Sequence, residues 1–148
     1  MLADFQRALA DLTASPELCQ SVRADATVLR AHYALTDREA ARLAGIVGHA
    51  GMAAACTVYR MNRLAPLALG LAATLRALGP AGREVVSEYW RVHPRGLTHA
   101  FAEADRFARW LSARIASGAD VAAQVPALLA REAAEITHAL AASAAVSP

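Results

Sequence analysis

The chain of 148 residues contains no lysine, and all 15 of its basic side chains are arginines. A biased genome composition is enough to account for this absence, although arginine also suits the pairing with carboxylates and phosphates found at interfaces. The formal net charge is only +2, and the charges are interspersed without a basic run. Nucleic-acid binding usually needs a concentrated basic face that neutralises phosphates. The charge pattern therefore argues against a nucleic-acid partner.

Aromatic residues are also scarce, at 5%, and long runs of valine, isoleucine and threonine are missing. Those residue types favour strands, whereas alanine, which supplies much of the 56% hydrophobic content, is the best helix former. The sequence predicts an all-α fold, a compact bundle of seven or eight short-to-medium helices. A chain of this length can bury one core without disulfides or metals. We expect a single helical domain over residues 1–142 and a frayed tail over residues 143–148.

Cysteine is limited to Cys19 and Cys56, which match no CxxC or metal-ligand spacing. Buried free thiols are the expected state, and a disulfide would require the fold to bring the two together. The longest apolar run, residues 64–75, is short of the roughly 20 residues that cross a bilayer. The N-terminal residues resemble an amphipathic helix and no signal peptide. We therefore expect a cytoplasmic protein without a membrane partner.

Several short signals predict where helices begin. Ser15 before Pro16 is a helix cap followed by proline at the first position, and the helix should run to about Arg30. Residues 36–39 form a capping box. Further helices are expected from about Met52 to Leu64, from Leu67 to Leu78, over residues 82–92, from Thr98 to the glycine at 118, and after Pro126.

Prolines and glycines predict where helices end. Pro66 lacks the N–H that a helix interior needs, so the chain should kink or restart there. Gly48 and Gly51 bracket another break. Pro94 should stop a helix before it, because its ring disfavours helical geometry at the preceding residue. Within the helix that follows, Glu103 and Arg106 are expected to pair on the solvated side.

Signals for catalysis are weak. The five histidines are His32, His49, His93, His99 and His138, and none belongs to an HExxH arrangement or to a carboxylate cluster at ligand spacing. No glycine-rich phosphate loop and no nucleophile–base pair is apparent. We therefore predict no catalytic residue, no metal and no cofactor in this chain. The rival hypothesis is a small metal or cofactor enzyme that uses His32, His49 or His138.

One candidate site lies on a helix around residue 60. At helical spacing Tyr59, Asn62 and Arg63 share a face, and Pro66 follows on the same side. In a structural role, Tyr59 packs while Asn62 and an arginine satisfy carbonyl groups freed by the kink. In a functional role, the tyrosine and the arginines contact a partner, as these residue types often do. The sequence leaves both interpretations open.

A second candidate lies where the aromatic segment ends in His93-Pro94-Arg95. Structurally, this tripeptide is a rigid elbow between two helices. Functionally, Trp90, Arg91 and Arg95 around it could form an aromatic and basic docking surface. The two roles are compatible with each other.

The order of these motifs resembles the N-terminal helical domain of the MbnC/HvfC/BufC-like accessory proteins. The segments that carry the resemblance are the opening residues 2–9, Val58-Tyr59-Arg60 followed by Asn62, residues 75–79, the aromatic-to-His-Pro segment 89–94, Phe107 to Leu111, and residues 130–132. Each motif alone is weak, and their shared order is what carries specificity. Residues 125–128 depart from the pattern, because the aromatic residue expected beside Pro126 is missing.

The resemblance implies a binding role. Members of that family accompany multinuclear non-haem iron enzymes that oxidatively modify ribosomally made, Cys-containing peptides, and the iron belongs to the partner enzyme. No catalytic residue is therefore carried over to this chain. The precursor peptide is a further candidate partner, although longer relatives engage its leader through a second domain. The alternative function is that of a DNA-binding transcriptional regulator, which the small net charge disfavours.

These observations give two sets of candidate residues. The expected partner-contact residues are Tyr59, Arg60, Arg63, Trp90, Arg91, His93 and Arg95. The expected structural residues are Asn62, Pro66, Pro94, Phe107, Leu111 and Glu132.

Overall fold

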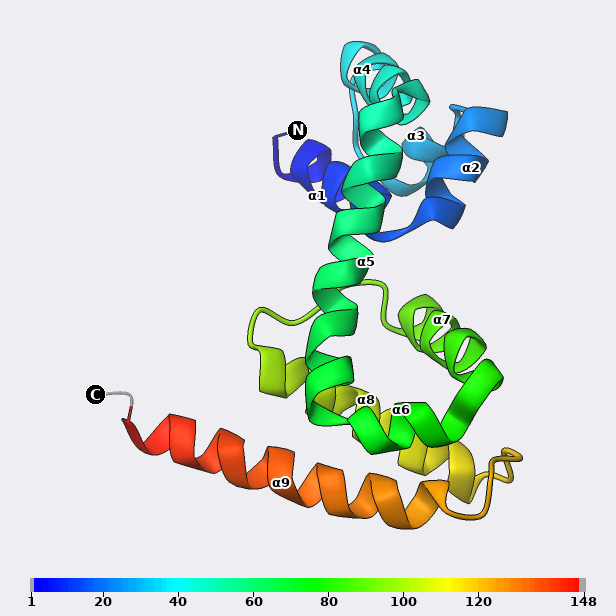
Figure 1. Ribbon diagram of the computed structural model, residues 1–148. Helices are drawn as coiled ribbons and strands as arrows, with labels where there is room; N and C mark the ends of the chain where they lie inside the picture. The colour runs from blue at the N-terminus through cyan, green and yellow to red at the C-terminus, as the bar shows by residue number, and fades with distance from the viewer. Residues whose placement is uncertain (1, 147–148) are drawn as a thin grey trace. The chain divides into compact units, whose positions relative to one another are not determined.

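The computed structural model describes residues 2–146, and over that range the chain forms helices and short connections without a strand (Figure 1). The predicted all-α fold is confirmed. The helices form two compact units, Met1–Met61 and Asn62–Pro148, and each is described by itself below. The expectation of a single domain over residues 1–142 stays a prediction.

The first unit contains α1 (Leu2–Ala14), α2 (Pro16–Ala24), α3 (Val28–His32), α4 (Asp37–Gly48) and the first part of α5 (Ala50–Gly70). Helices α1, α2 and α4 pack against one another. Together with α3 and the first part of α5 they enclose one core, formed by Ala8, Leu12, Cys19, Val22, Leu29, Leu43, Val47, Met52 and Cys56. Both cysteines are buried free thiols, as the sequence predicts.

The capping signals in this unit act as expected. The Ser15 hydroxyl accepts a hydrogen bond from the Leu18 N–H, and Thr36 and Glu39 form a reciprocal capping box. The helix that begins at Pro16 nevertheless ends at Ala24 instead of near Arg30. Asp25 Oδ1 accepts hydrogen bonds from both the backbone N–H and the hydroxyl of Thr27. This local turn competes with helix continuation, and α3 starts only afterwards.

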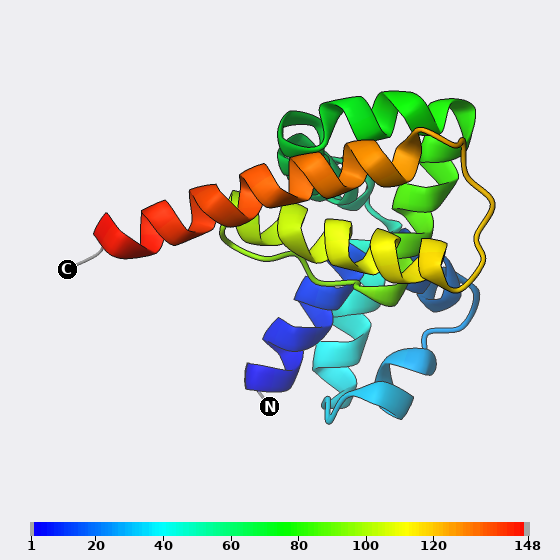
Figure 2. The same cartoon turned by 90° about the horizontal axis from the view of Figure 1, so that it is seen from below.

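The second unit contains the end of α5, α6 (Ala72–Leu78), the short 3₁₀ turn η1 (Gly79–Ala81), α7 (Gly82–Val92), α8 (Ala100–Ala116) and α9 (Val125–Val146). Helix α8 lies alongside α9, and α6 packs against α9 as well (Figure 2). The core is built from the inward faces of these helices. It consists of Leu67, Leu71, Leu78, Val85, Val86, Tyr89, Ala104, Phe107, Ala108, Leu111, Val125, Leu129 and Ile136.

The expectation of a helix restart at Pro66 is wrong, whereas the alternative of a kink there stays a prediction. Helix α5 continues through Pro66 to Gly70, and the break comes at Leu71, before α6. Proline at position 66 deprives the Asn62 carbonyl of its helical donor. Asn62 is solvent-exposed, so water can hydrate that carbonyl and the helix can continue. Asn62 therefore lies on the outer side of α5 and away from the core.

Other helix ends agree with the sequence signals. Gly79 and Gly118 adopt positive φ angles of 55° and 98° where α6 and α8 finish, a conformation that favours glycine. Helix α7 ends at Val92, two residues before Pro94. Helix α9 continues to Val146, so residues 143–146 of the expected frayed tail are helical and exposed up to residue 145. The last two residues of that tail lie outside the described part of the chain.

Among the described helices, none is both long and apolar enough to cross a membrane alone, whereas α4 and α5 meet those limits together but are bent by 78° at their junction.

Candidate functional site

The connection between α7 and α8, residues 93–99, is an irregular segment of the second unit that is anchored by side chains of neighbouring helices. It begins where Pro94 prevents α7 from continuing, and it ends at His99, the residue before α8. A loop of this length normally depends on its own turns or on solvent for hydrogen bonds. This one is held instead by side chains that reach it from α5 and α8.

Glu103, in the first turn of α8, is the centre of this anchoring. Its side chain is 1% exposed. Oxygen Oε1 accepts hydrogen bonds from Arg63 Nη2 at 2.7 Å, Arg63 Nε at 3.0 Å and the Tyr89 hydroxyl at 3.0 Å. Oxygen Oε2 accepts from the Leu97 N–H at 2.7 Å and from Arg106 Nη2 at 2.8 Å. Because donors within the protein occupy both oxygens, this carboxylate serves to hold structure in place.

Two arginines extend the network to the loop backbone. Arg63 Nη1 donates to the Pro94 carbonyl at 3.1 Å, and Arg106 Nη2 donates to the Arg95 carbonyl at 2.8 Å. The Leu97 N–H binds the buried carboxylate directly, and the Pro94 and Arg95 carbonyls are connected to it through the two arginines. Charge-assisted hydrogen bonds of this kind are roughly twice as strong as neutral ones. The loop is therefore ordered by contacts and not only by Pro94.

Aromatic rings enclose the network from the core side. Tyr89 is fully buried and makes an edge-to-face contact with Phe107 at 5.0 Å between centroids, and its ring also lies 5.5 Å from Trp110. The Arg63 guanidinium lies 5.5 Å from the Tyr89 centroid and 6.0 Å from that of Trp90. These contacts exclude water from the ion pair and add cation–π attraction.

The same environment changes the acidity of His93. Its pKa is lowered by burial first, and then by the positive charges of Arg106 and Arg63, while Glu103 opposes them. Two arginines face a single carboxylate in this network, so the surplus positive charge disfavours an imidazolium ion. The His93 ring lies 5.1 Å from the Tyr89 ring, between centroids, at a tilt of 50°. The lowered pKa favours the neutral form of His93 at the base of the loop.

Three large apolar side chains in this loop and at the adjoining ends of α7 and α8 are exposed to solvent. Val92 is 57% exposed, Leu97 44% and Phe101 40%. The exposed Arg91 and Arg95 lie beside them in the sequence. We call these five residues, Val92, Leu97, Phe101, Arg91 and Arg95, the loop surface. Large apolar side chains on an ordered backbone, mixed with arginine, are typical of protein recognition sites.

A hollow of about 290 Å³ lies on the same unit next to α7. Its walls include the apolar side chains of Leu64, Leu75, Val86 and Trp90. Trp90 is one helical turn before Pro94, so it connects this hollow with the base of the loop. Concave apolar surface of this kind can receive a side chain from a partner.

The predicted contact residues are only partly brought together. Trp90, Arg91, His93 and Arg95 lie at or next to the loop, whereas Tyr59 and Arg60 belong to the first unit. Arg60 Nη2 donates there to both carboxylate oxygens of Glu17, at 3.0 and 3.2 Å. Arg63 differs most from the expected surface role, because its side chain is 5% exposed and bound to Glu103. It supports the loop from beneath.

The predicted structural residues have varied environments. Phe107 and Leu111 are fully buried in the core of the second unit. Glu132 of α9 accepts hydrogen bonds from the backbone N–H groups of Ala73 and Thr74, at 2.8 and 2.9 Å, and so caps the start of α6. The pKa of Glu132 is lowered, since hydrogen bonds from Thr74 and Ala73 outweigh the effect of burial.

Sequence reasoning missed the residue at the centre of the network. Glu103 and Arg106 do form the expected pair, at 2.8 Å, but Glu103 is buried and not on the solvated side. Leu97 and Phe101 were also missed as surface residues; Phe101 follows the apolar spacing of α8 and yet is 40% exposed. One sequence signal could have identified Glu103. It is an acidic residue in the first turn of the helix that follows the His-Pro break, and a helix N-terminus favours negative charge.

The histidines do not gather into a metal site in the part of the chain that the structure describes. No group of three or more His, Cys, Asp or Glu side chains there could hold an ion. His32, His49 and His138 are each exposed on different helices or helix ends. The hypothesis of a histidine-based enzyme therefore gains no geometric support.

No family model, curated protein or solved structure matches this chain at a significant level.

Proposed function

We propose that this chain is a non-catalytic accessory subunit that docks on a multinuclear non-haem iron enzyme. In this proposal the partner holds the iron and modifies a ribosomally made, Cys-containing peptide by oxidation. The motif order from residue 2 to residue 132, which resembles the MbnC/HvfC/BufC-like accessory proteins, motivates the choice of partner. The observation that carries a docking role is the anchored loop surface of the second unit.

Three features support docking through this surface. Leu97 is exposed although a buried network fixes the loop that carries it, and Phe101 is exposed in the first turn of α8, directly after the loop. A preorganised loop loses little conformational entropy when a partner binds, so more of the contact energy is retained as affinity. Arg91 and Arg95 of the loop surface belong to the residue type that is enriched at interface hot spots. The hollow beside Trp90 supplies a neighbouring concave feature.

Association with the enzyme is the first test. The full chain is co-expressed with a multinuclear non-haem iron enzyme of the proposed class, and the affinity of the pair is measured by calorimetry. We expect a stable complex with a negative heat-capacity change, because apolar surface is buried. Failure of the two proteins to associate would overturn the proposal. If the chain slows the migration of duplex DNA in a gel at low salt, that result would favour the alternative of a DNA-binding regulator.

Matched variants locate the contact. The double change Leu97→Ser and Phe101→Ser should weaken the complex about tenfold or more, since two apolar anchors are lost. Leu69→Ser is the control, because Leu69 is 85% exposed on α5 and lies outside the loop surface. An equal loss in both variants would place the contact elsewhere. Far-UV circular dichroism checks that all variants keep their helices.

A further inference from the structure

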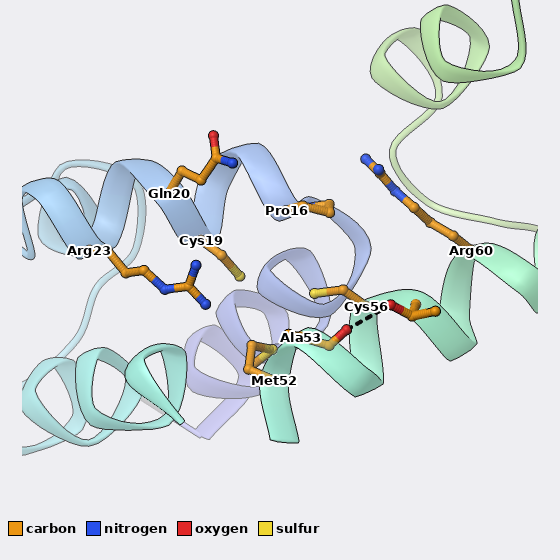
Figure 3. A pocket seen from close by; sticks show the side chains of 9 residues that line it. Pro16, Cys19, Gln20, Arg23, Met52, Ala53, Cys56 and Arg60 are labelled. Carbon is orange, nitrogen blue, oxygen red and sulfur yellow. Dashed lines mark hydrogen bonds between the residues drawn. The ribbon is translucent and has the colours of Figure 1, made fainter. Parts of the chain in front are cut away.

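The first unit contains a pair of thiols that the docking proposal does not use. Cys19 comes from α2 and Cys56 from α5, and their side chains point toward each other across a cavity (Figure 3). Both thiols donate to the same acceptor, the Leu12 carbonyl, at 3.1 Å for Cys19 and 3.4 Å for Cys56. The two sulfur atoms therefore flank one oxygen atom.

The thiols lie at the edge of a space that a small ion can enter. The cavity has a volume of about 250 Å³, and Met52 and Arg23 line it together with the cysteines. Cys19 is 2% exposed, Cys56 5% and Met52 5%. The site thus brings two buried thiols to the edge of one small cavity. Sulfur ligands of this kind are preferred by soft metal ions.

The number of available ligands restricts which ion fits. Structural zinc takes four ligands, and iron–sulfur clusters are commonly held by four cysteines. The chain has only two cysteines, and over residues 2–146 no third His, Cys, Asp or Glu completes a cluster. Cu(I) is a soft ion that forms stable complexes with two thiolates alone. It is the ion that this donor set can satisfy.

We propose that Cys19 and Cys56 bind one Cu(I) ion as a bis-thiolate site. The two thiols release two protons to solvent when the ion enters, so two S–H bonds break and two S–Cu bonds form without a change of oxidation state. The product carries one negative charge. This proposal concerns the first unit and is independent of the docking role.

The surroundings of Cys19 act in both directions on a negatively charged product. Burial, together with the neighbouring Cys56, raises the pKa of Cys19 to about 11, so without a metal this thiol stays protonated at neutral pH. Arg23 acts in the opposite direction on Cys19, and its guanidinium is fixed by donating to the Val47 carbonyl at 3.0 and 3.1 Å. Glu17 also faces Cys19, but it is paired with Arg60 at 3.0 Å. A fixed cation beside the site favours a negatively charged copper–thiolate complex.

The test is an anaerobic titration of the reduced full-length chain with Cu(I) in competition with a chromophoric Cu(I) chelator. We expect one ion per chain, release of two protons per ion in weakly buffered solution, and sulfur ligation by X-ray absorption. Cys19→Ser or Cys56→Ser should weaken binding by more than about a hundredfold, because even outer-shell partners of a metal contribute ten- to hundredfold. Circular dichroism of the Cys→Ser variants and of the corresponding Cys→Ala variants checks that the loss of binding does not come from unfolding.

Met52→Leu is the matched control for the shape of the cavity. It preserves volume and both thiols, so its affinity for Cu(I) should change by less than about tenfold. An equal loss in Met52→Leu and the cysteine variants would contradict a two-thiolate site. Copper that binds without proton release, or that remains in the Cys19→Ala/Cys56→Ala chain, would also overturn the proposal.

Discussion

Arg63 and Glu103 form a buried ion pair that joins α5 to the start of α8. Arg63 Nη2 lies 2.7 Å from Glu103 Oε1, and the two side chains are only 5% and 1% exposed. Removing two charges from water costs several kcal/mol for each ion, and only good geometry with further hydrogen bonds offsets that cost. Tyr89, Arg106 and the Leu97 N–H supply those bonds. The pair therefore functions as the centre of a network that fixes the loop surface.

Glu103→Gln should destabilise the protein strongly. The change leaves Arg63 buried without its carboxylate, and breaking such a pair from one side costs about 3–5 kcal/mol. Urea unfolding measures the loss. Asp105→Asn is the matched control on the same helix, since Asp105 pairs with the 75% exposed Arg109 and contributes a few tenths of a kcal/mol. Similar stability of the two variants would contradict a central role for Glu103.

Much of the fold could be predicted from the sequence because its signals are local. The Ser15 cap, the capping box at Thr36 and the stop before Pro94 each depend on a few neighbouring residues. Pro66 shows the limit of such rules. The cost of proline in a helix depends on whether the freed carbonyl can reach water, and only the fold shows that Asn62 is exposed.

The candidate site was harder to predict because its centre depends on distant residues. The pairing of Glu103 with Arg106 follows from helical spacing. Its burial does not, because it requires Arg63, which is 40 residues earlier in the chain. Likewise, the arginine at 63 and the one at 60 look equivalent in the sequence. Only the packing of α5 shows that one is buried beneath the loop and that the other binds Glu17.

Glu132→Gln should reduce stability by about 1–3 kcal/mol near neutral pH, because a charged cap on two backbone N–H groups of α6 is lost. The pKa of Glu132 is lowered in the folded chain. Its stabilisation is therefore present above the ordinary glutamate pKa and disappears as the pH falls through the lowered value. Chemical unfolding at several pH values measures both effects. Glu135→Gln, an exposed change on the same helix, should reproduce neither.

His93 should titrate below the ordinary histidine range in an NMR experiment, since its pKa is lowered by burial and by Arg106 and Arg63. Protonation is then less favourable in the folded than in the unfolded chain. Stability should accordingly rise with pH between the lowered pKa and the ordinary one, and fall as the pH drops through that window. Arg106→Gln should move the His93 midpoint upward. Arg106→Lys keeps the positive charge, so an equal upward shift in this variant would contradict the electrostatic cause.

Gly96→Ala tests how closely the loop packs on the buried pair. A Cβ at Gly96 would lie 3.0 Å from Arg63 Cδ and 3.1 Å from Arg63 Nε. Arg63 cannot move away easily, because both ends of its guanidinium are bound, to Glu103 and to the Pro94 carbonyl. Overpacking of this kind costs about 1–3 kcal/mol. Thermal unfolding should therefore show a clear loss of stability.

Gly45→Ala is the same substitution at another glycine, and we expect it to have the opposite effect on stability. Nothing lies within 4 Å of a Cβ at Gly45, which is inside α4. Alanine there should stabilise the chain by roughly 0.5–1 kcal/mol, because glycine is unfavourable within a helix. Changes of opposite sign in the free energy of unfolding for Gly96→Ala and Gly45→Ala would support tight packing of the loop against Arg63. A stabilising effect of Gly96→Ala would mean that the loop is looser than the buried network requires.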